Sequence, residues 1–242
     1  MNWKPTHAMV LAAGLGKRMK PITDTLPKPL VKVAGKVLLD WGLDSLAAAG
    51  VEHAVVNVHY LPDQIIAHLS GRIRPQVTIS DERAELLDSA GGIVKALSRL
   101  GNDPFYVLNA DTFWIDRSVP DLERLAIAWQ PERMDILLML AELDQATGHS
   151  GGTDFLLGGD GRAVRAKGDP KGLIYAGAAI VSPRIFDGVE AAPHSLNAYF
   201  DRAIGQGRLY GLRMDGSWIT VGTPDAIAPA EAAVAKARGR KA

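Results

Sequence analysis

Segments with the character of buried strands alternate with helix-like segments along the first 141 residues. The alternation starts with an apolar strand at 7–13, a helix at 38–49 and a strand at 53–59. Because parallel neighbouring strands need a crossover segment between them, this order predicts a mainly parallel sheet with helices on both faces. The further segments expected in this half are helices at 62–69, 89–100 and 119–129 and strands at 76–80, 104–109 and 134–141.

The second half of the chain shows a different pattern of elements, with shorter strands and more turns. Expected strands at 153–157, 163–166 and 173–182 are separated by glycine-containing turn signals, and helices are expected at 196–204 and 224–237. No linker, repeat or low-complexity segment divides the chain. We therefore expect one domain, with the second half packed on the same sheet as the first.

Composition excludes several classes of function. The chain has 27 Lys plus Arg and 27 Asp plus Glu, whereas general nucleic-acid or anionic-membrane binders carry a basic excess. No cysteine is present, which excludes disulfides and thiolate chemistry. No apolar run approaches the roughly 20 residues of a membrane span, and no signal peptide is recognisable. These features predict a cytoplasmic enzyme without nucleic-acid or membrane partners.

The loop after the first strand is rich in glycine and in cations. Gly14 and Gly16 are accompanied by one acid, Asp24, and three prolines that stiffen the loop. Backbone N–H groups of a glycine turn approach anions closely, and fixed cations neutralise them, so we interpret the loop as a polyphosphate-binding segment rather than a solvated basic loop. The six cations of the loop are Lys17, Arg18, Lys20, Lys28, Lys32 and Lys36.

Two other glycine motifs do not fit this loop. A dinucleotide fingerprint requires a third glycine where this chain has Met19. A Walker A loop requires Ser or Thr after Gly-Lys, and Arg18 stands there. Preorganised cations beside a glycine turn nevertheless suit a triphosphate better than a random surface does.

Residues 11–30, with Leu-x-Ala-Gly-x-Gly-x-Arg-Met-x-Pro-x-Thr followed by Pro-Lys-Pro-Leu, resemble the signature of sugar-1-phosphate nucleotidyltransferases. Segments 85–92, 109–111 and 218–224 resemble further motifs of that family, so the resemblance covers nearly the whole chain. It implies an α/β, Rossmann-like nucleotidyltransferase fold: three α/β/α layers around a mixed, mostly parallel sheet. It also implies a nucleotide-binding half at about 1–141 and a sugar-phosphate-binding half at about 142–242.

The implied reaction joins a nucleoside triphosphate to a sugar 1-phosphate, forms a nucleotide sugar and releases pyrophosphate. The short length and the Ser-Ala-Gly-Gly segment at 89–92 are most similar to N-acetylmuramate-1-phosphate uridylyltransferases and to short mannose-1-phosphate guanylyltransferase-like proteins. The first similarity implies UTP and N-acetylmuramate 1-phosphate as substrates and a role in peptidoglycan recycling. Mannose-1-phosphate guanylyltransferase activity is the alternative, and a non-catalytic nucleotide or sugar-phosphate sensor is a further one. The implied partners are these small molecules, and either a monomer or a homodimer is compatible with the sequence.

The resemblance assigns catalytic roles to Arg18 for the leaving phosphates, to Lys28 for the α-phosphate and sugar phosphate, and to Asp111 as a Mg²⁺ ligand. Such a transfer needs positioned reactants and neutralised charge more than covalent help. Without the resemblance, Asp111 would be read as a turn or cap residue. The residues implied to bind the nucleotide are Leu11, Ala12, Ala13, Gly14, Gly16, Lys17, Arg18, Glu85, Ser89, Gly91 and Gly92.

The sugar side is less clearly marked. The residues implied to bind the sugar phosphate are Lys28, Asn109, Lys167, Tyr175 and Gly177. Gly91 and Gly92 also suit a glycine turn before a helix whose N-cap is Ser89, and both roles are compatible. Thr220 stands where the family carries a second metal-binding carboxylate. We therefore expect Asp111, phosphates and water to hold the magnesium, as this ion permits.

Overall fold

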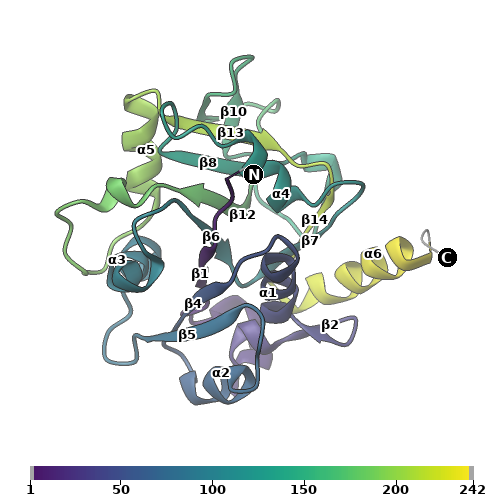
Figure 1. Cartoon of the computed structure of the whole chain (residues 1–242). Coiled ribbons are helices and arrows are strands. Elements are labelled where there is room, and N and C mark those ends of the chain that lie inside the picture. Colours follow the sequence, from purple (N-terminus) through teal and green to yellow (C-terminus); the bar gives the residue numbers. More distant parts are fainter. Residues whose placement is uncertain (1–2, 240–242) are drawn as a thin grey trace.

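The computed structural model describes residues 3–239 and has a seven-stranded sheet at its centre (Figure 1). β12 is antiparallel to both of its neighbours, and all other neighbouring strands are parallel. The predicted mixed, mostly parallel sheet is confirmed. In spatial order the strands are β13 (Leu209–Arg213), β8 (Ile136–Ala141), β12 (Ile174–Val181), β6 (Phe105–Asn109), β1 (His7–Leu11), β4 (His53–Val58) and β5 (Gln76–Asp81).

Helices cover both faces of this sheet and complete the three layers. α1 (Leu38–Ala48), α2 (Pro62–Leu69) and α4 (Asp121–Ala128) bury apolar side chains in the core on one face. α3 (Asp88–Leu100) and α5 (Asn197–Gly205) do so on the other face (Figure 1). The helices expected from the sequence are all present, and their ends differ from the prediction by no more than three residues.

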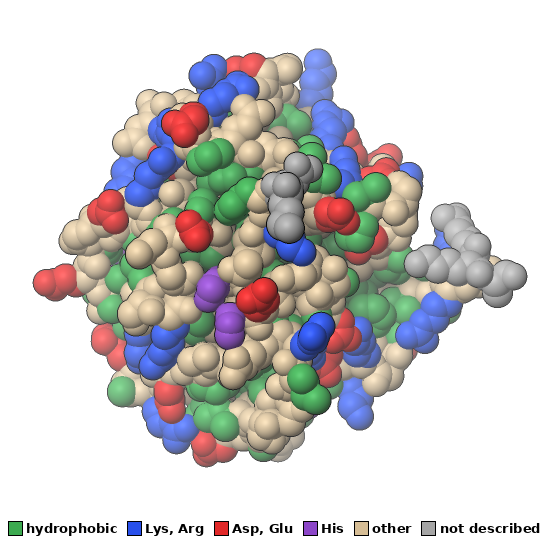
Figure 2. Space-filling model, viewed as in Figure 1, with side chains coloured by type: hydrophobic (Ala, Val, Ile, Leu, Met, Phe, Trp, Pro, Cys, Tyr) green, Lys and Arg blue, Asp and Glu red, His purple; other side chains and the backbone are tan. Residues whose placement is uncertain are grey.

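A smaller sheet beside the main one was not expected. It contains β7 (Thr112–Ile115), β14 (Ser217–Thr220) and β9 (Ala146–Thr147), and it packs in a third core with α6 (Ile227–Gly239). In Figure 1 the far end of α6 projects from the body. Positive and negative side chains are interspersed over the face shown in Figure 2, in keeping with the balanced composition.

The two halves of the sequence share the main sheet. β12 and β13 come from the second half, and β12 is inserted between β6 and β8 of the first half. A two-stranded unit, β10 (Phe155–Leu157) with β11 (Ala163–Arg165), precedes β12 along the chain. Its predicted strands are present.

The segment after β1 is a succession of short turns rather than an open loop. It contains 3-10 turns at Lys17–Met19, Ile22–Asp24 and Lys28–Leu30, and then the paired strands β2 (Lys32–Val33) and β3 (Lys36–Val37). Each turn buries at least one residue. The segment is therefore anchored to the body along its length.

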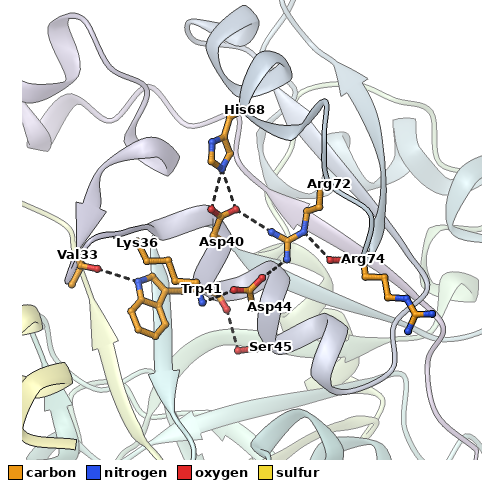
Figure 3. A network of polar contacts seen from close by, with 9 residues as sticks. All are labelled: Val33, Lys36, Asp40, Trp41, Asp44, Ser45, His68, Arg72 and Arg74. Atoms are coloured by element: carbon orange, nitrogen blue, oxygen red, sulfur yellow. Dashed lines mark hydrogen bonds and ion pairs between the residues drawn. The ribbon is translucent and has the colours of Figure 1, made fainter. Parts of the chain in front are cut away.

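An ionic network joins α1 to the turn after α2 and anchors the end of this segment (Figure 3). Asp40 accepts from Arg72 at 3.0 Å and from His68 at 3.1 Å, and Asp44 pairs with both Arg72 and Lys36. The ammonium of Lys36 also lies 4.4 Å from the Trp41 ring centroid. Lys36 is one of the six cations of the loop that follows β1. Its charge is balanced by Asp44 of α1 and not left free for a phosphate.

Candidate active site

A cleft of about 430 Å³ lies at the carboxyl ends of β1, β4 and β6. Open α/β sheets bind ligands at this edge, and the volume lies within the ordinary range for small-molecule sites. The predicted site residues that line this cleft are Leu11, Ala12, Ala13, Gly14, Lys28, Ser89, Asn109 and Asp111. The other lining residues are Pro29, Asn57, Leu86, Asp88 and Ala110.

The two loop glycines serve different purposes. Gly14 lines the cleft, and a Cβ built there would meet no atom within 4 Å, so its backbone stands open to a ligand. Gly16 has φ +62°, and its Cβ would lie 3.0 Å from Thr23 Cγ2 and 3.1 Å from Lys28 Cβ. Gly16 is therefore required for the turn itself, because a side chain there meets both a left-handed backbone and close neighbours.

Lys28 and Asp111 form an ion pair inside the cleft. The Lys28 ammonium donates to Asp111 Oδ2 at 2.6 Å across 83 residues of sequence, and the two side chains are 11% and 37% exposed. Asp111 lies in the short connection between β6, which ends at Asn109 on the cleft, and β7, which begins at Thr112. A mostly buried cation and a half-exposed carboxylate are thus fixed against each other where a polyphosphate would be bound.

Pairing of β14 with β7 in the smaller sheet brings the backbone of Thr220 close to that of Asp111. Thr220 is in register with Thr112, and the neighbouring Val221 N–H donates to the Asp111 carbonyl at 3.1 Å. The backbone of Thr220 is therefore held close to that of Asp111, and its side chain is a neutral hydroxyl. Asp215 lies before the other end of β14, where it pairs with Arg117 at 3.8 Å. It is thus not a substitute for Thr220.

Lys17 and Arg18 lie outside the residues that line the cleft, and both are exposed. Neither side chain has a hydrogen bond or an ion pair with any residue in the described range 3–239. The Arg18 guanidinium lies 3.7 Å from the position of a Cβ on Gly222. Lys20 differs from both, because it pairs with Asp24 at 3.0 Å.

A buried chain of hydrogen bonds, which the sequence did not predict, supports the glycine loop that contains Gly14 and Gly16. Ala12 N–H donates to Asn57 Oδ1 at 2.7 Å, and Asn57 Nδ2 donates to Glu82 Oε1 at 2.9 Å. The other carboxylate oxygen of Glu82 accepts the Leu87 N–H at 3.2 Å. Glu82 is fully buried, whereas Glu85, the predicted nucleoside contact, is exposed and does not line the cleft.

The glycines of segment 85–92 lie inside α3 rather than in a turn before it. A Cβ on Gly91 would lie 2.1 Å from the Ala192 carbonyl oxygen, and one on Gly92 would lie 2.7 Å from both Asn57 Nδ2 and Glu82 Oε1. Neighbouring protein groups lie close to both glycines, and neither glycine lines the cleft. The predicted turn is therefore wrong and is replaced by close packing of the helix, whereas the contact with the nucleoside stays a prediction.

The predicted N-cap role of Ser89 is also wrong, because α3 begins at Asp88, one residue earlier. The Ser89 hydroxyl instead accepts the Leu196 N–H at 2.9 Å and joins α3 to the segment before α5. Ser89 still lines the cleft, so its placement in the site is retained.

A second cleft of about 260 Å³ adjoins the first, and Leu11, Ser89 and Asn109 line both. Tyr175 is one of the residues that line the second cleft. Its hydroxyl is buried and has no hydrogen-bond partner among the described residues. Burial raises the pKa of this phenol above its usual range, so the hydroxyl keeps its proton. Arg165 is the cation that lines this second cleft.

The other two residues predicted for the sugar side lie elsewhere. Lys167 is exposed in a turn with φ +49° and lines neither cleft. Gly177 lies in the irregular part of β12, with φ +76°, and its Cβ would lie 2.5 Å from Thr112 Cγ2. Gly177 therefore allows strands to approach closely, and it lines neither cleft.

The profile of the MobA-like NTP transferase domain matches residues 8–156, more than half of the chain. The chain belongs to this family. The predicted reaction class, nucleotidyl transfer, is thus confirmed. Among curated relatives, an N-acetylmuramate alpha-1-phosphate uridylyltransferase of Caulobacter vibrioides is 45% identical, with 98% of this chain and 100% of the relative covered. A protein of the same name from Neisseria meningitidis serogroup B is 38% identical, with 93% and 96% covered.

Two further proteins are more distantly similar to this chain. A probable mannose-1-phosphate guanylyltransferase of Arabidopsis thaliana is 28% identical, and only 62% of its length is covered. Among solved structures, a UDP-glucose pyrophosphorylase with bound UDP-glucose has a TM-score of 0.78 at 18% identity, with 96% of this chain and 99% of that one covered. The predicted nucleotidyltransferase fold is confirmed.

No helix within residues 3–239 combines the length and apolar character needed to cross a membrane. Nor does this range contain three or more His, Cys, Asp or Glu side chains grouped so that they could bind a metal ion.

Proposed function

We propose that this protein condenses UTP with N-acetylmuramate 1-phosphate, giving the UDP-sugar and pyrophosphate. The observation that carries the proposal is the 45% identity to an N-acetylmuramate alpha-1-phosphate uridylyltransferase along the whole of both chains. The guanylyltransferase alternative has less support, because that match leaves more than a third of the relative uncovered. A place in recycling cell-wall sugars, in the cytoplasm, belongs to the proposal.

The open backbone at Gly14 and the neighbouring Ala12–Ala13 are proposed to contact the nucleotide. Lys28 suits the α-phosphate and the incoming sugar phosphate, because its ammonium is preoriented by Asp111 within the main cleft. Arg18 and Lys17 suit the leaving phosphates, since both are exposed beside the same loop and carry no competing ion pair within residues 3–239. Placing two anions in line and neutralising their charge is the main task of such an enzyme.

Mg²⁺ is proposed as the cofactor, and the donor set fits it. Asp111 offers one carboxylate oxygen that is not engaged by Lys28, and magnesium is commonly bound by one or two carboxylates with substrate phosphates and water. The ion would help to neutralise the triphosphate. The neutral Thr220 beside Asp111 leaves the cleft with less negative charge than two carboxylates would. The phosphates of the substrate therefore supply the remaining anionic ligands.

The second cleft is proposed to hold the sugar, in line with the predicted division at about residue 141. It is lined mostly from the second half of the chain, through Asp154, Phe155, Arg165 and Asn197. It opens into the main cleft beside Asn109, which suits a contact with a sugar hydroxyl. A product with its nucleotide in one cleft and its sugar in the other fits this arrangement.

Pyrophosphate release tests the proposal. The protein is incubated with each of UTP and GTP and with N-acetylmuramate, N-acetylglucosamine and mannose 1-phosphates, with and without Mg²⁺. We expect release with UTP and N-acetylmuramate 1-phosphate that depends on magnesium. Faster release with GTP and mannose 1-phosphate would establish the guanylyltransferase instead. Saturable nucleotide binding without release for any pair would leave only a binding protein.

A further inference from the structure

The second cleft contains a cation that neither the phosphate-binding loop nor the proposed transfer step uses. Arg165, at the end of β11, is the cationic side chain among the described residues that line this cleft. Its side chain is 28% exposed, so the guanidinium is partly withdrawn from water. Lys28, the cation of the main cleft, is already paired with Asp111.

Neighbouring groups fix the orientation of Arg165. Its Nε donates to Asp201 Oδ1 at 2.7 Å, and its Nη2 donates to the carbonyl and side-chain oxygens of Asn197 at 3.2 and 3.0 Å. The guanidinium carbon lies 4.8 Å from the ring centroid of Phe155 and 5.8 Å from that of Phe200. An arginine stacked and bonded in this way loses little further conformational freedom when it binds an anion.

The same guanidinium retains an unused donor. Within residues 3–239, Nη1 of Arg165 has no hydrogen bond, although the other two nitrogens do. Tyr175 also lines the cleft, but its hydroxyl is buried beyond the reach of a ligand there. The free nitrogen of an oriented guanidinium is therefore the group that can supply a charged donor to a ligand in this cleft.

We propose that Arg165 binds the carboxylate of the sugar substrate and selects an acidic sugar 1-phosphate over a neutral one. The inference rests on the proposed function, because N-acetylmuramate differs from N-acetylglucosamine by an added lactyl ether that ends in a carboxylate. Arginine suits a carboxylate through charge-assisted N–H donors, and the stacked phenylalanines reduce competition from water. Asp154, in the same cleft, already accepts the Tyr175 N–H at 2.8 Å and suits a sugar hydroxyl.

The test compares N-acetylmuramate 1-phosphate with its analogue in which the lactyl carboxylate is a primary amide. With UTP and Mg²⁺, kcat/KM is measured for both sugars in the wild type and in Arg165→Gln. We expect the wild type to prefer the acid by at least about tenfold. We expect Arg165→Gln to lower kcat/KM for the acid about 30-fold, as for a lost bond to a charged group, and to bring the acid-to-amide ratio near one. The KM for UTP stays unchanged.

Two control variants separate recognition from folding. Arg162→Gln removes an arginine of the same hairpin that pairs with Asp160 instead, and we expect the wild-type acid-to-amide ratio. Asp201→Asn removes the ion pair of Arg165 but keeps the guanidinium, and the acid preference is expected to persist.

The possible failures are distinguishable. A wild type that releases no pyrophosphate from UTP with the acid overturns the proposed function and this inference with it. A wild type that uses acid and amide equally well, or an Arg165→Gln variant that keeps the wild-type ratio, overturns only the inference. Equal loss for both sugars in Arg165→Gln would also overturn it, because the arginine would then act through the fold alone.

Discussion

The glycine loop and the wall of the second cleft are stabilised in different ways. The loop is supported by a buried chain from Ala12 N–H through Asn57 to Glu82. The wall is fixed by exposed side chains, with Arg165 bonded to an Asp201 that is 61% exposed. Buried, fully bonded polar groups are costly to change, whereas exposed ion pairs contribute little. Substitutions in the support of the glycine loop should therefore destabilise the fold more than substitutions in the wall of the second cleft.

The largest expected effect concerns the carboxylate of Asp111 in the main cleft. Asp111→Asn removes the charge that orients Lys28 and that we propose binds Mg²⁺. We expect the rate of pyrophosphate release to fall about 10³-fold, as for loss of a main electrostatic contact in the transition state. The asparagine oxygen still accepts from Lys28, so the thermal unfolding midpoint is expected to change little.

Asp215→Asn is the matched control, because this exposed carboxylate pairs weakly at the other end of β14. Its turnover should equal that of the wild type. An Asp111→Asn variant that keeps more than a tenth of wild-type turnover would remove this residue from the proposed machinery.

The next variant breaks the buried support of the loop. Glu82→Gln leaves an amide N–H₂ facing either Asn57 Nδ2 or the Leu87 N–H, so a donor meets a donor where water is excluded. We expect a loss of about 2 kcal/mol in the free energy of unfolding, measured with urea, and weaker UTP binding. Glu85→Gln changes an exposed residue of the same segment and is expected to stay within about 0.5 kcal/mol of the wild type. Similar stability in the two variants would show that the buried chain does not support the loop.

Close packing around the same chain gives a smaller effect. Gly92→Ala would bring a Cβ to 2.7 Å from Asn57 Nδ2 and Glu82 Oε1. We expect it to destabilise the fold by about 1–2 kcal/mol in urea unfolding, because buried neighbours must shift. Gly205→Ala is the matched change in another helix, where nothing lies within 4 Å of the new Cβ, and it should leave stability equal or slightly higher. Equal destabilisation by both would mean that the tight contact at Gly92 is unimportant.

The smallest expected effect is on the wall of the second cleft. Asp201→Asn breaks its ion pair with Arg165 on an exposed surface, so we expect the free energy of unfolding to change by less than about 0.5 kcal/mol. The measurement is urea unfolding beside Glu82→Gln under the same conditions. A loss as large as that of Glu82→Gln would contradict the contrast between the two regions.

Local patterns predicted most of the fold. Apolar runs and turn signals located the helices and six of the seven strands of the main sheet, because each of these elements buries a face of its own. β7, β14 and β13 were missed. They are only four or five residues long, which is too short for a period to be recognised. Their pairing is determined by long-range contacts, which a local reading does not contain.

Residues of the candidate site could be predicted where they belong to a single sequence motif within one loop. Gly14 and Lys28 were found with their neighbours, and the resemblance supplied Asp111. Glu82 was missed because an acidic residue in a polar segment looks exposed, and only the fold places it beneath Asn57. Arg165 was missed for a similar reason: its role depends on partners in α5, and the nearby Lys167 seemed the better match.

A crystal structure with UDP-N-acetylmuramate bound would test the account most directly. We expect the uridine against Ala12, Ala13 and Gly14, the diphosphate beside Lys28 and Asp111, and the lactyl carboxylate within hydrogen-bond distance of Arg165 Nη1. A sugar turned away from the second cleft, or a uridine seated in that cleft, would contradict the assignment of nucleotide and sugar to the two regions.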